Sequence, residues 1–228
     1  PTLPANAGVM RPVRVVTAEG SVVDARFPVA VGAGNVEVSQ RVVDVCCRAL
    51  AEVLRGQVPA ASQGTMNNLL IGGPGVGSGP GGEAEPWVYY ETVGGGQGGR
   101  PPRPGDRSRT PLPGQSGIHT AMTNTRNTPI EALERAFPLR VLRYRLRRGS
   151  GGAGWSAGGE GIERDLQVLV DATVSLITER RVSQPWGLAG GEPGAVGENW
   201  LLPGGDEARA ERLPDKCTIQ LKAGDVVR

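Results

Sequence analysis

The chain has 228 residues, and its 25 basic and 23 acidic side chains leave a net charge of +2 at pH 7. This length suits one large domain or two small ones, and so small a net charge argues against a nucleic-acid partner. No run of about 18 apolar residues is present in the sequence, which excludes a membrane-spanning helix. Glycine supplies 36 residues and proline 19, but the glycines keep no triplet period, so a collagen-like fold is excluded as well.

The first quarter of the chain contains the strongest helix signal. Residues 12–27 alternate valines around a Glu-Gly-Ser turn, which predicts two short strands. Residues 37–55 then place apolar side chains at three- and four-residue steps, which predicts a long helix capped by Asn35 or Ser39. Cys46 falls on or beside the apolar stripe of this helix, so we expect it to be a packed core thiol.

The cysteines and the single histidine bear on location and on metal binding. Cys46, Cys47 and Cys217 show neither metal-ligand spacing nor the pattern of a disulfide framework. Three reduced thiols are typical of a cytoplasmic protein, which is the predicted location. One histidine and scattered carboxylates make no metal-ligand set either, so no metal site is expected in this chain.

The middle of the chain alternates strand-like and loop-like composition. The run at 87–93 contains three aromatic residues and predicts a strand. Glycine, proline and arginine dominate on either side of it, which predicts mobile surface loops at about 72–86 and 100–115.

The last hundred residues are more regular. Thr128, Pro129 and Glu131 match a capping box, which predicts a short helix at about 129–137. Strands are predicted farther on, at residues 139–148, 162–170, 173–181 and 217–221. Because strands outnumber helices and do not alternate regularly with them, we predict a β-rich α+β fold with mixed or antiparallel strands.

Two glycine runs imitate a nucleotide-binding motif. Residues 94–99 and 149–154 both match the dinucleotide fingerprint GxGxxG and follow predicted strands. Neither leads into a helix, so no helix N-terminus is available for a pyrophosphate, and we reject a Rossmann fold. A Gly-Lys-Ser or Gly-Lys-Thr sequence is absent, so no ATP-binding phosphate loop is predicted.

Two polar runs are the candidates for chemistry. Residues 117–129 combine hydroxyl, amide and guanidinium groups with His119, the only histidine of the chain, and residues 62–68 are similarly rich in amides. Such groups hydrogen-bond a neutral polar ligand such as a cyclic amide, or alternatively the backbone of irregular loops. Glu91 follows two tyrosines, and its carboxylate suits either a base or an arginine's partner.

These runs, taken in order, resemble the hydantoinase B/oxoprolinase family. The matching segments are residues 32–41, 62–68, 89–96, 117–129, 147–154, 178–181 and 185–191. The resemblance covers most of the chain but only about the C-terminal half of a B-type subunit. Residues 1–228 are therefore expected to be a single segment of a larger subunit.

The resemblance implies an ATP-dependent enzyme that opens cyclic amides such as hydantoin, N-methylhydantoin or 5-oxoproline. A partner A-type subunit would bind ATP and Mg²⁺ and activate the substrate, which the B-type subunit then processes. This segment would bind no cofactor itself, and a divalent metal would belong to the N-terminal half of the B-type subunit. The implied partners are thus the A-type subunit, the rest of the B-type subunit and a small-molecule substrate, without nucleic acid or membrane.

Roles follow for the polar residues. His119 is the expected proton shuttle or carbonyl polariser because an imidazole titrates near neutral pH, with Glu91 as a base. The expected substrate-binding residues are Asn67, Asn68, Thr123, Asn124, Arg126 and Asn127. Ala121 stands where family members often have a second histidine. Two alternatives remain: a subunit of an ATP-dependent ketone carboxylase, and a non-catalytic structural or assembly piece.

Overall fold

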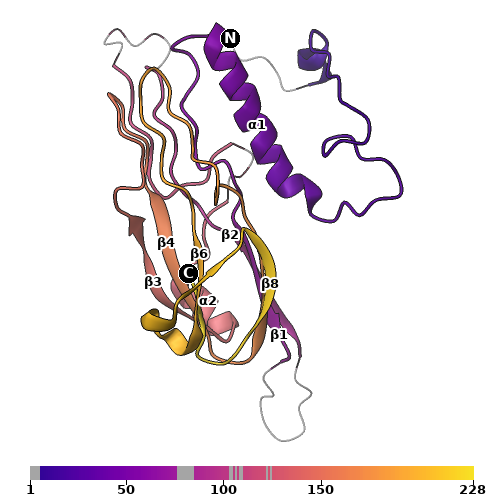
Figure 1. Ribbon diagram of the computed structural model, residues 1–228, viewed down its shortest axis with the longest axis vertical. Helices are drawn as coiled ribbons and strands as arrows, with labels where there is room; N and C mark the ends of the chain where they lie inside the picture. The colour runs from indigo at the N-terminus through magenta and orange to yellow at the C-terminus, as the bar shows by residue number, and fades with distance from the viewer. Residues whose placement is uncertain are drawn as a thin grey trace, which may run out of the picture.

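The computed structural model describes residues 6–75, 85–102, 105, 107, 110–121, 123 and 125–228. Within these residues it contains two α-helices, three short 3-10 helices and nine strands. A β-sandwich forms one end of the molecule, and glycine-rich segments with the long helix α1 (Gly34–Val53) form the other (Figure 1). The predicted β-rich α+β class is confirmed.

The strands form two antiparallel sheets. One sheet has the order β2 (Trp87–Thr92), β1 (Asn68–Gly73), β5 (Ala172–Ile177) and β8 (Lys216–Leu221). The other has the order β3 (Leu139–Arg147), β4 (Gly161–Val168), β9 (Val226–Val227), β6 (Asn199–Leu202) and β7 (Glu211–Leu213). Five of the seven strands predicted from the sequence are present, as β2, β3, β4, β5 and β8, whereas β1, β6, β7 and β9 are strands that the sequence pattern does not predict.

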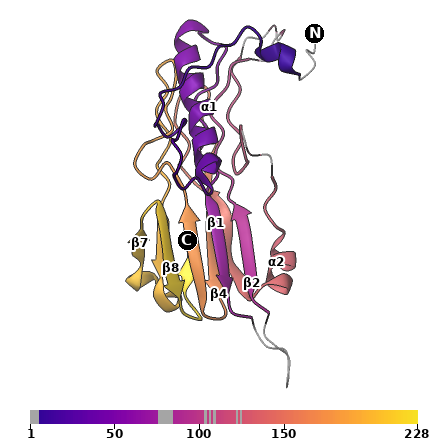
Figure 2. The same cartoon turned by 90° about the vertical axis from the view of Figure 1, so that its right-hand side faces the viewer.

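The inner faces of the two sheets share one hydrophobic core. Ile71 and Val174 from the first sheet and Leu166 and Val168 from the second are at most 1% exposed. The predicted short helix is confirmed as α2 (Ile130–Ala136), which lies beside β2 in Figure 2 and buries Leu133 completely. The 3-10 helices are η1 (Ala7–Met10), η2 (Pro203–Gly205) and η3 (Glu207–Arg209).

Beyond the sandwich, five segments run alongside one another with neither helix nor strand: residues 58–63, and the glycine-containing residues 94–100, 111–118, 150–160 and 185–197. We call them the glycine bundle. Backbone hydrogen bonds join them, such as Gln97 N–H to the Gln115 carbonyl at 2.9 Å and Gly159 N–H to the Gln97 carbonyl at 2.8 Å. A Cβ added at Gly114 would overlap the Gln97 carbonyl oxygen. Glycine is required there for close approach, as at the axis of the collagen triple helix.

Helix α1 packs with the opposite polarity to the one predicted. Its buried residues are Glu37, Gln40 and Asp44, whereas Val45 is 61% and Val53 80% exposed. The buried polar groups find specific partners in loops of the main body, and that hydrogen bonding decides which face turns inward. The helix begins at Gly34 after Ala33, which makes no side-chain cap, so neither predicted cap residue is used.

Two further sequence predictions on the N-terminal quarter are wrong. Cys46 is exposed and is not a core thiol, because the apolar stripe beside it faces outward. The two strands predicted in residues 12–27 are absent, and that segment contains a single β-bridge, between Ser21 and Asp24. Its valines have no neighbouring strand to pack against, and Phe27 is 97% exposed.

The predicted loops fall partly outside the described residues. Residues 76–84 lie outside them, and so do several positions between 103 and 109. At the margins, Gly72 and Gly73 belong to β1, which shortens the first predicted loop. Arg100 pairs with Leu112 through two backbone hydrogen bonds, which closes the base of the second one.

Candidate functional site

An open hollow of about 690 Å³ lies where the polar run around His119 meets strand β3. Gln115, residues 117–119 and residues 125–131 line it together with Tyr144 of β3. The chain on its glycine-bundle side is fixed by a bridge between Gly95 and Ile118, whose backbone groups exchange hydrogen bonds of 2.8 and 3.0 Å. The hollow therefore has a rigid floor next to the only imidazole of the chain.

Glu91, at the end of β2, is the buried anion behind this hollow. Its Oε1 accepts hydrogen bonds from the Thr128 backbone N–H at 2.7 Å and from Asn127 Nδ2 at 3.0 Å. Its Oε2 accepts from the Tyr89 hydroxyl and pairs with Arg164 Nη1 across the sandwich. Because Glu91 takes the Thr128 amide and α2 begins only at Ile130, the predicted capping box does not form.

Tyr89 and Arg164 both contact the Oε2 side of this carboxylate. Burial and the hydrogen bond to Glu91 raise the pKa of Tyr89 to about 12, so its hydroxyl remains a donor at all ordinary pH values. Arg164 is 7% exposed, and its guanidinium carbon lies 5.3 Å from the ring centre of Tyr144. Its Nε and Nη2 have no hydrogen-bond partner among the described residues.

Asn127 connects Glu91 to the surface of the hollow. Its Nδ2 donates to Glu91 Oε1 and to the Thr92 carbonyl, both at 3.0 Å, and its Oδ1 accepts from the Tyr144 hydroxyl at 3.0 Å. Both amide hydrogens are thus used, and the side chain is fixed on three sides.

His119 is half-buried, and burial lowers its pKa below the ordinary value of 6.5. The charge of Glu91 and the nearby backbone of Thr92 act in the opposite direction, but burial is the larger effect. The imidazole is therefore neutral at pH 7. Both ring nitrogens are buried and lack a hydrogen-bond partner within the described part of the chain, which leaves two buried polar atoms for a water molecule or a ligand to satisfy.

The other expected residues of the same run are dispersed. Arg126 lines the hollow but is exposed, and Ala121 is exposed with a positive φ of 55°. Asn124 lies outside the described residues. Thr123 is 3% exposed, and its hydroxyl accepts from Gln40 Nε2 of α1 at 3.3 Å, so it faces the helix and not the hollow.

Asn67 and Asn68 lie in a separate network that anchors α1. Asn68 donates to Glu37 Oε1 of α1 at 2.9 Å and accepts from the Tyr90 hydroxyl at 2.7 Å. Asn67 Oδ1 accepts from Arg181 Nη1 at 2.8 Å, and burial lowers the pKa of that arginine to about 10. The structure therefore brings Glu91, His119 and Asn127 together and places the two asparagines elsewhere.

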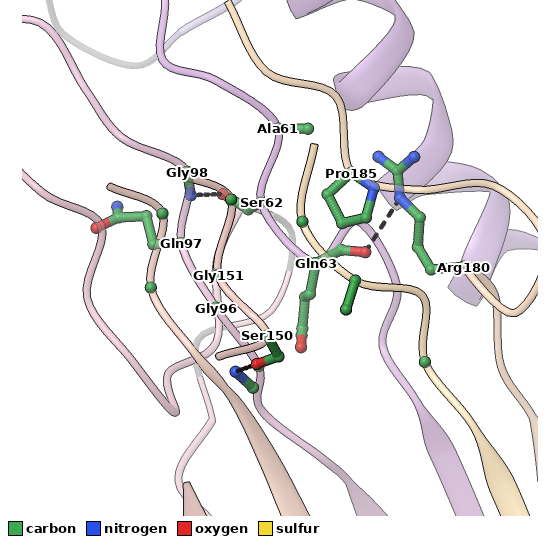
Figure 3. A pocket seen from close by; sticks show the side chains of 18 of the residues that line it. Ala61, Ser62, Gln63, Gly96, Gln97, Gly98, Ser150, Gly151, Arg180 and Pro185 are labelled. Atoms are coloured by element: carbon green, nitrogen blue, oxygen red, sulfur yellow. Dashed lines mark hydrogen bonds between the residues drawn. The ribbon is translucent and has the colours of Figure 1, made fainter. Parts of the chain in front are cut away.

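A second cavity, of about 780 Å³, lies among the segments of the glycine bundle (Figure 3). Backbone and small side chains form much of its wall, and the hydrogen bonds drawn there, such as Arg180 Nε to the Gln63 carbonyl at 3.2 Å, serve the scaffold. This cavity has no histidine, so we place the candidate site at the hollow around His119. Among the described residues, no three His, Cys, Asp or Glu side chains gather as metal ligands.

Arg164, Tyr144 and Tyr89 are the site residues that the sequence does not reveal. Tyr144 is flanked by two arginines in β3, and Arg164 is flanked by two acidic residues in β4, so charged neighbours surround both in the sequence. Of the three, only Arg164 could have been found from the sequence. It shares one face of β4 with Ile162 and Leu166, and a charged side chain on such an apolar face has to pair with a buried anion.

Comparison with known proteins places the chain in a family. The family described as hydantoinase B/oxoprolinase matches residues 1–228, the whole chain. The chain belongs to this family. An uncharacterized protein of Methanocaldococcus jannaschii is 41% identical over 227 residues, which cover all of this hydantoinase B/oxoprolinase chain and 36% of the relative.

Two further family members carry functional names. The 5-oxoprolinase 1 of Arabidopsis thaliana is 37% identical over 226 residues, 99% of this chain and 16% of the plant protein. A Pseudomonas protein that is named as the B-type component of a D-/L-hydantoinase is 33% identical over 85% of this chain and 30% of its own length. This chain thus spans about a third or less of the length of these relatives.

Solved structures show the same fold. The nucleotide-free structure of acetone carboxylase matches with a TM-score of 0.53 at 20% identity, over 78% of this chain and 26% of that one. The ATP-dependent caprolactamase of Pseudomonas jessenii matches with a TM-score of 0.53 at 19% identity, over 79% and 30%. Within the part of the chain that the structure describes, no helix is long and apolar enough to cross a membrane.

Proposed function

We propose that this chain is the part of a B-type subunit that completes ring opening in an ATP-dependent cyclic-amide hydrolase of the hydantoinase or 5-oxoprolinase type. The observation that carries the proposal is the imidazole of His119, which lines the hollow beside Asn127 and whose two buried ring nitrogens lack hydrogen-bond partners within the described residues. Among the named relatives, a 5-oxoprolinase and a hydantoinase component support a cyclic amide as substrate. The likeness to acetone carboxylase is one of fold at 20% identity and does not favour a ketone.

In this proposal His119 moves the proton that ring opening requires. Water attacks the ring carbonyl carbon and loses a proton to the imidazole, and the C–N bond breaks. The imidazolium then returns that proton to the departing ring nitrogen, so the histidine ends as it began. An imidazole can both take up and give back a proton, which suits both halves of this transfer. Activation of the carbonyl by ATP and Mg²⁺ belongs, in this proposal, to the A-type partner.

We assign Glu91 a positioning role. Its carboxylate already accepts from Tyr89, Asn127 and Thr128 and pairs with Arg164. To act as a base it would have to release one of these donors and leave Arg164 buried with an unpaired charge, which costs several kcal/mol. Its contribution to the reaction is therefore to fix Asn127 beside His119.

The test is turnover by the assembled enzyme with His119 replaced. His119→Gln keeps the size and polarity but cannot carry a proton, and we expect it to lower kcat about 100-fold or more while ATP-binding affinity is unchanged. Val182→Ala, at a side chain that is 93% exposed and outside the hollow, serves as control. Normal turnover by His119→Gln would remove the basis for the proposal.

We also propose that the outer face of α1 packs against another polypeptide of the assembled enzyme, the A-type partner being the first candidate. Most of the exposed large apolar side chains among the described residues belong to positions 9–54, on α1 and the arm before it. So large an apolar surface is typical of an interface. Val53→Glu should lower co-purification of the partner without unfolding the chain, and Val88→Glu, at a 68% exposed valine of β2, is the matched control.

A further inference from the structure

The hydrogen bonds of Asn127 determine what it can offer a ligand in the hollow. Glu91 Oε1 and the Thr92 carbonyl only accept, so the Asn127 NH₂ group must face them, and both of its hydrogens are used. The Tyr144 hydroxyl donates to Oδ1 and so fixes the same orientation from the other side.

One hydrogen-bonding position on Asn127 remains. A side-chain carbonyl oxygen has two lone pairs, and within the described residues Oδ1 accepts only from Tyr144. Asn127 is half-buried and lines the hollow together with His119. It can therefore accept a hydrogen bond from a ligand but cannot donate one to a carbonyl or a carboxylate.

We propose that Asn127 Oδ1 binds the N–H of the ring nitrogen that departs, and thereby selects cyclic amides with a hydrogen on that nitrogen over ketones and over amides that are substituted there. This assignment rests on the proposed function, because it takes the hollow around His119 as the substrate site. It places the ring nitrogen beside the imidazole that must deliver a proton to that nitrogen. Glu91, Arg164 and Tyr144 act through Asn127 as positioning residues.

The electrostatics agree with this orientation. Arg164 balances the charge of Glu91, so Glu91 can hold the Asn127 amide without leaving an unpaired anion at the hollow. The Tyr144 ring lies over the Arg164 guanidinium, which keeps the tyrosine hydroxyl directed at Asn127. A ketone has no N–H group and would leave Oδ1 with one lone pair facing an apolar or carbonyl group.

The test compares 5-oxoproline with N-methyl-5-oxoproline. Hydantoin is included as a second ligand that carries a ring N–H. KM is measured in the assembled enzyme, and binding to the protein by ligand-observed NMR. We expect the native protein to prefer 5-oxoproline over its N-methyl analogue by about tenfold, the usual worth of one hydrogen bond to a half-buried acceptor.

Tyr144→Phe distinguishes hydrogen bonding by Asn127 from steric exclusion of the N-methyl group. This substitution removes one of the three hydrogen bonds that orient the Asn127 amide, so Oδ1 is less fixed toward the ligand, and we expect the preference to fall to about threefold or less. Tyr90→Phe makes the same chemical change at the hydrogen bond to Asn68 Oδ1, outside the hollow, and should keep the native preference. If the methyl group of N-methyl-5-oxoproline weakened binding only by steric clash, the preference for 5-oxoproline would be the same in Tyr144→Phe as in the native protein.

The outcomes are distinct. Equal binding of the two oxoprolines by the native protein, or a preference unchanged by Tyr144→Phe, would overturn the role of Asn127 while leaving the proposed hydrolase intact. If neither oxoproline nor hydantoin binds or is turned over, the proposed function fails, and the assignment of Asn127 fails with it.

Discussion

Gly114 gives the sharpest test of the glycine bundle. A Cβ at this position would overlap the Gln97 carbonyl oxygen and lie close to the Gly159 backbone nitrogen, so Gly114→Ala must push three segments apart. Three backbone hydrogen bonds converge there: Gly114 N–H to Ala157, Gln97 N–H to Gln115, and Gly159 N–H to Gln97, all between 2.8 and 2.9 Å.

The magnitude follows from these bonds. Each contributes about 1 kcal/mol net, so stretching all three lowers the free energy of unfolding by about 3 kcal/mol. For a chain of this size that corresponds to a fall in Tm of roughly 6–12 °C. Urea denaturation followed by circular dichroism gives the free energy, and a thermal scan gives Tm.

The matched control is Gly34→Ala, the same chemical change at the first residue of α1. No atom lies within 4 Å of the Cβ that it would add, and its φ is not in the left-handed region. It should leave stability within about 0.5 kcal/mol or raise it slightly, because alanine favours helix. If Gly114→Ala proved as stable as Gly34→Ala, the close backbone contact would not be what stabilises the bundle.

Three further outcomes are expected. Because burial lowers the pKa of His119 in the folded chain, the unfolded chain takes up a proton more readily. The free energy of unfolding should therefore fall as pH drops below about 6.5. The urea midpoints measured at pH 7.5 and at pH 5.5 should differ less in His119→Gln than in the native protein. Arg164→Met alone should cost about 3–5 kcal/mol by leaving Glu91 buried and unpaired, and Glu91→Gln combined with it should recover part of that loss in the same assay. Asp44→Asn should lower the free energy of unfolding by about 2 kcal/mol or more, because Arg180, which is 4% exposed, loses its charged partner. An unchanged urea midpoint would show that α1 does not depend on this ion pair.

Strand prediction succeeded where alternating side chains also pack on neighbouring strands; residues 12–27 alternate but have no such neighbours and form no strand. The alternation of Val174 and Leu176 with Thr173 and Ser175 in β5 matches a sheet with one buried face. Strand β1 is hidden from such reasoning, because it begins at a buried asparagine and ends in two glycines. Its pairing with β2 and β5 depends on contacts that no short sequence window contains.

The orientation of α1 could not be deduced from periodicity alone. The apolar period fixes the helix, but Glu37, Gln40 and Asp44 face inward because loops more than 20 residues away offer them donors and acceptors. The candidate site behaves similarly. The polar run that contains His119 and Asn127 is visible in the sequence, whereas Arg164 and Tyr144 come from strands that only the fold brings beside it.

The glycine bundle also constrains the order in which this chain folds. Its hydrogen bonds join residues such as Ala61 and Trp186 or Ala60 and Gly99, which are far apart along the chain. Closing those long loops costs entropy, and glycine offers no side chain to bury in return. The sandwich strands β3 and β4, which are close in sequence and pair with each other along most of their length, can form first. We therefore expect the bundle to assemble last, with hydrogen exchange in its backbone amides slowing only after the sandwich is protected.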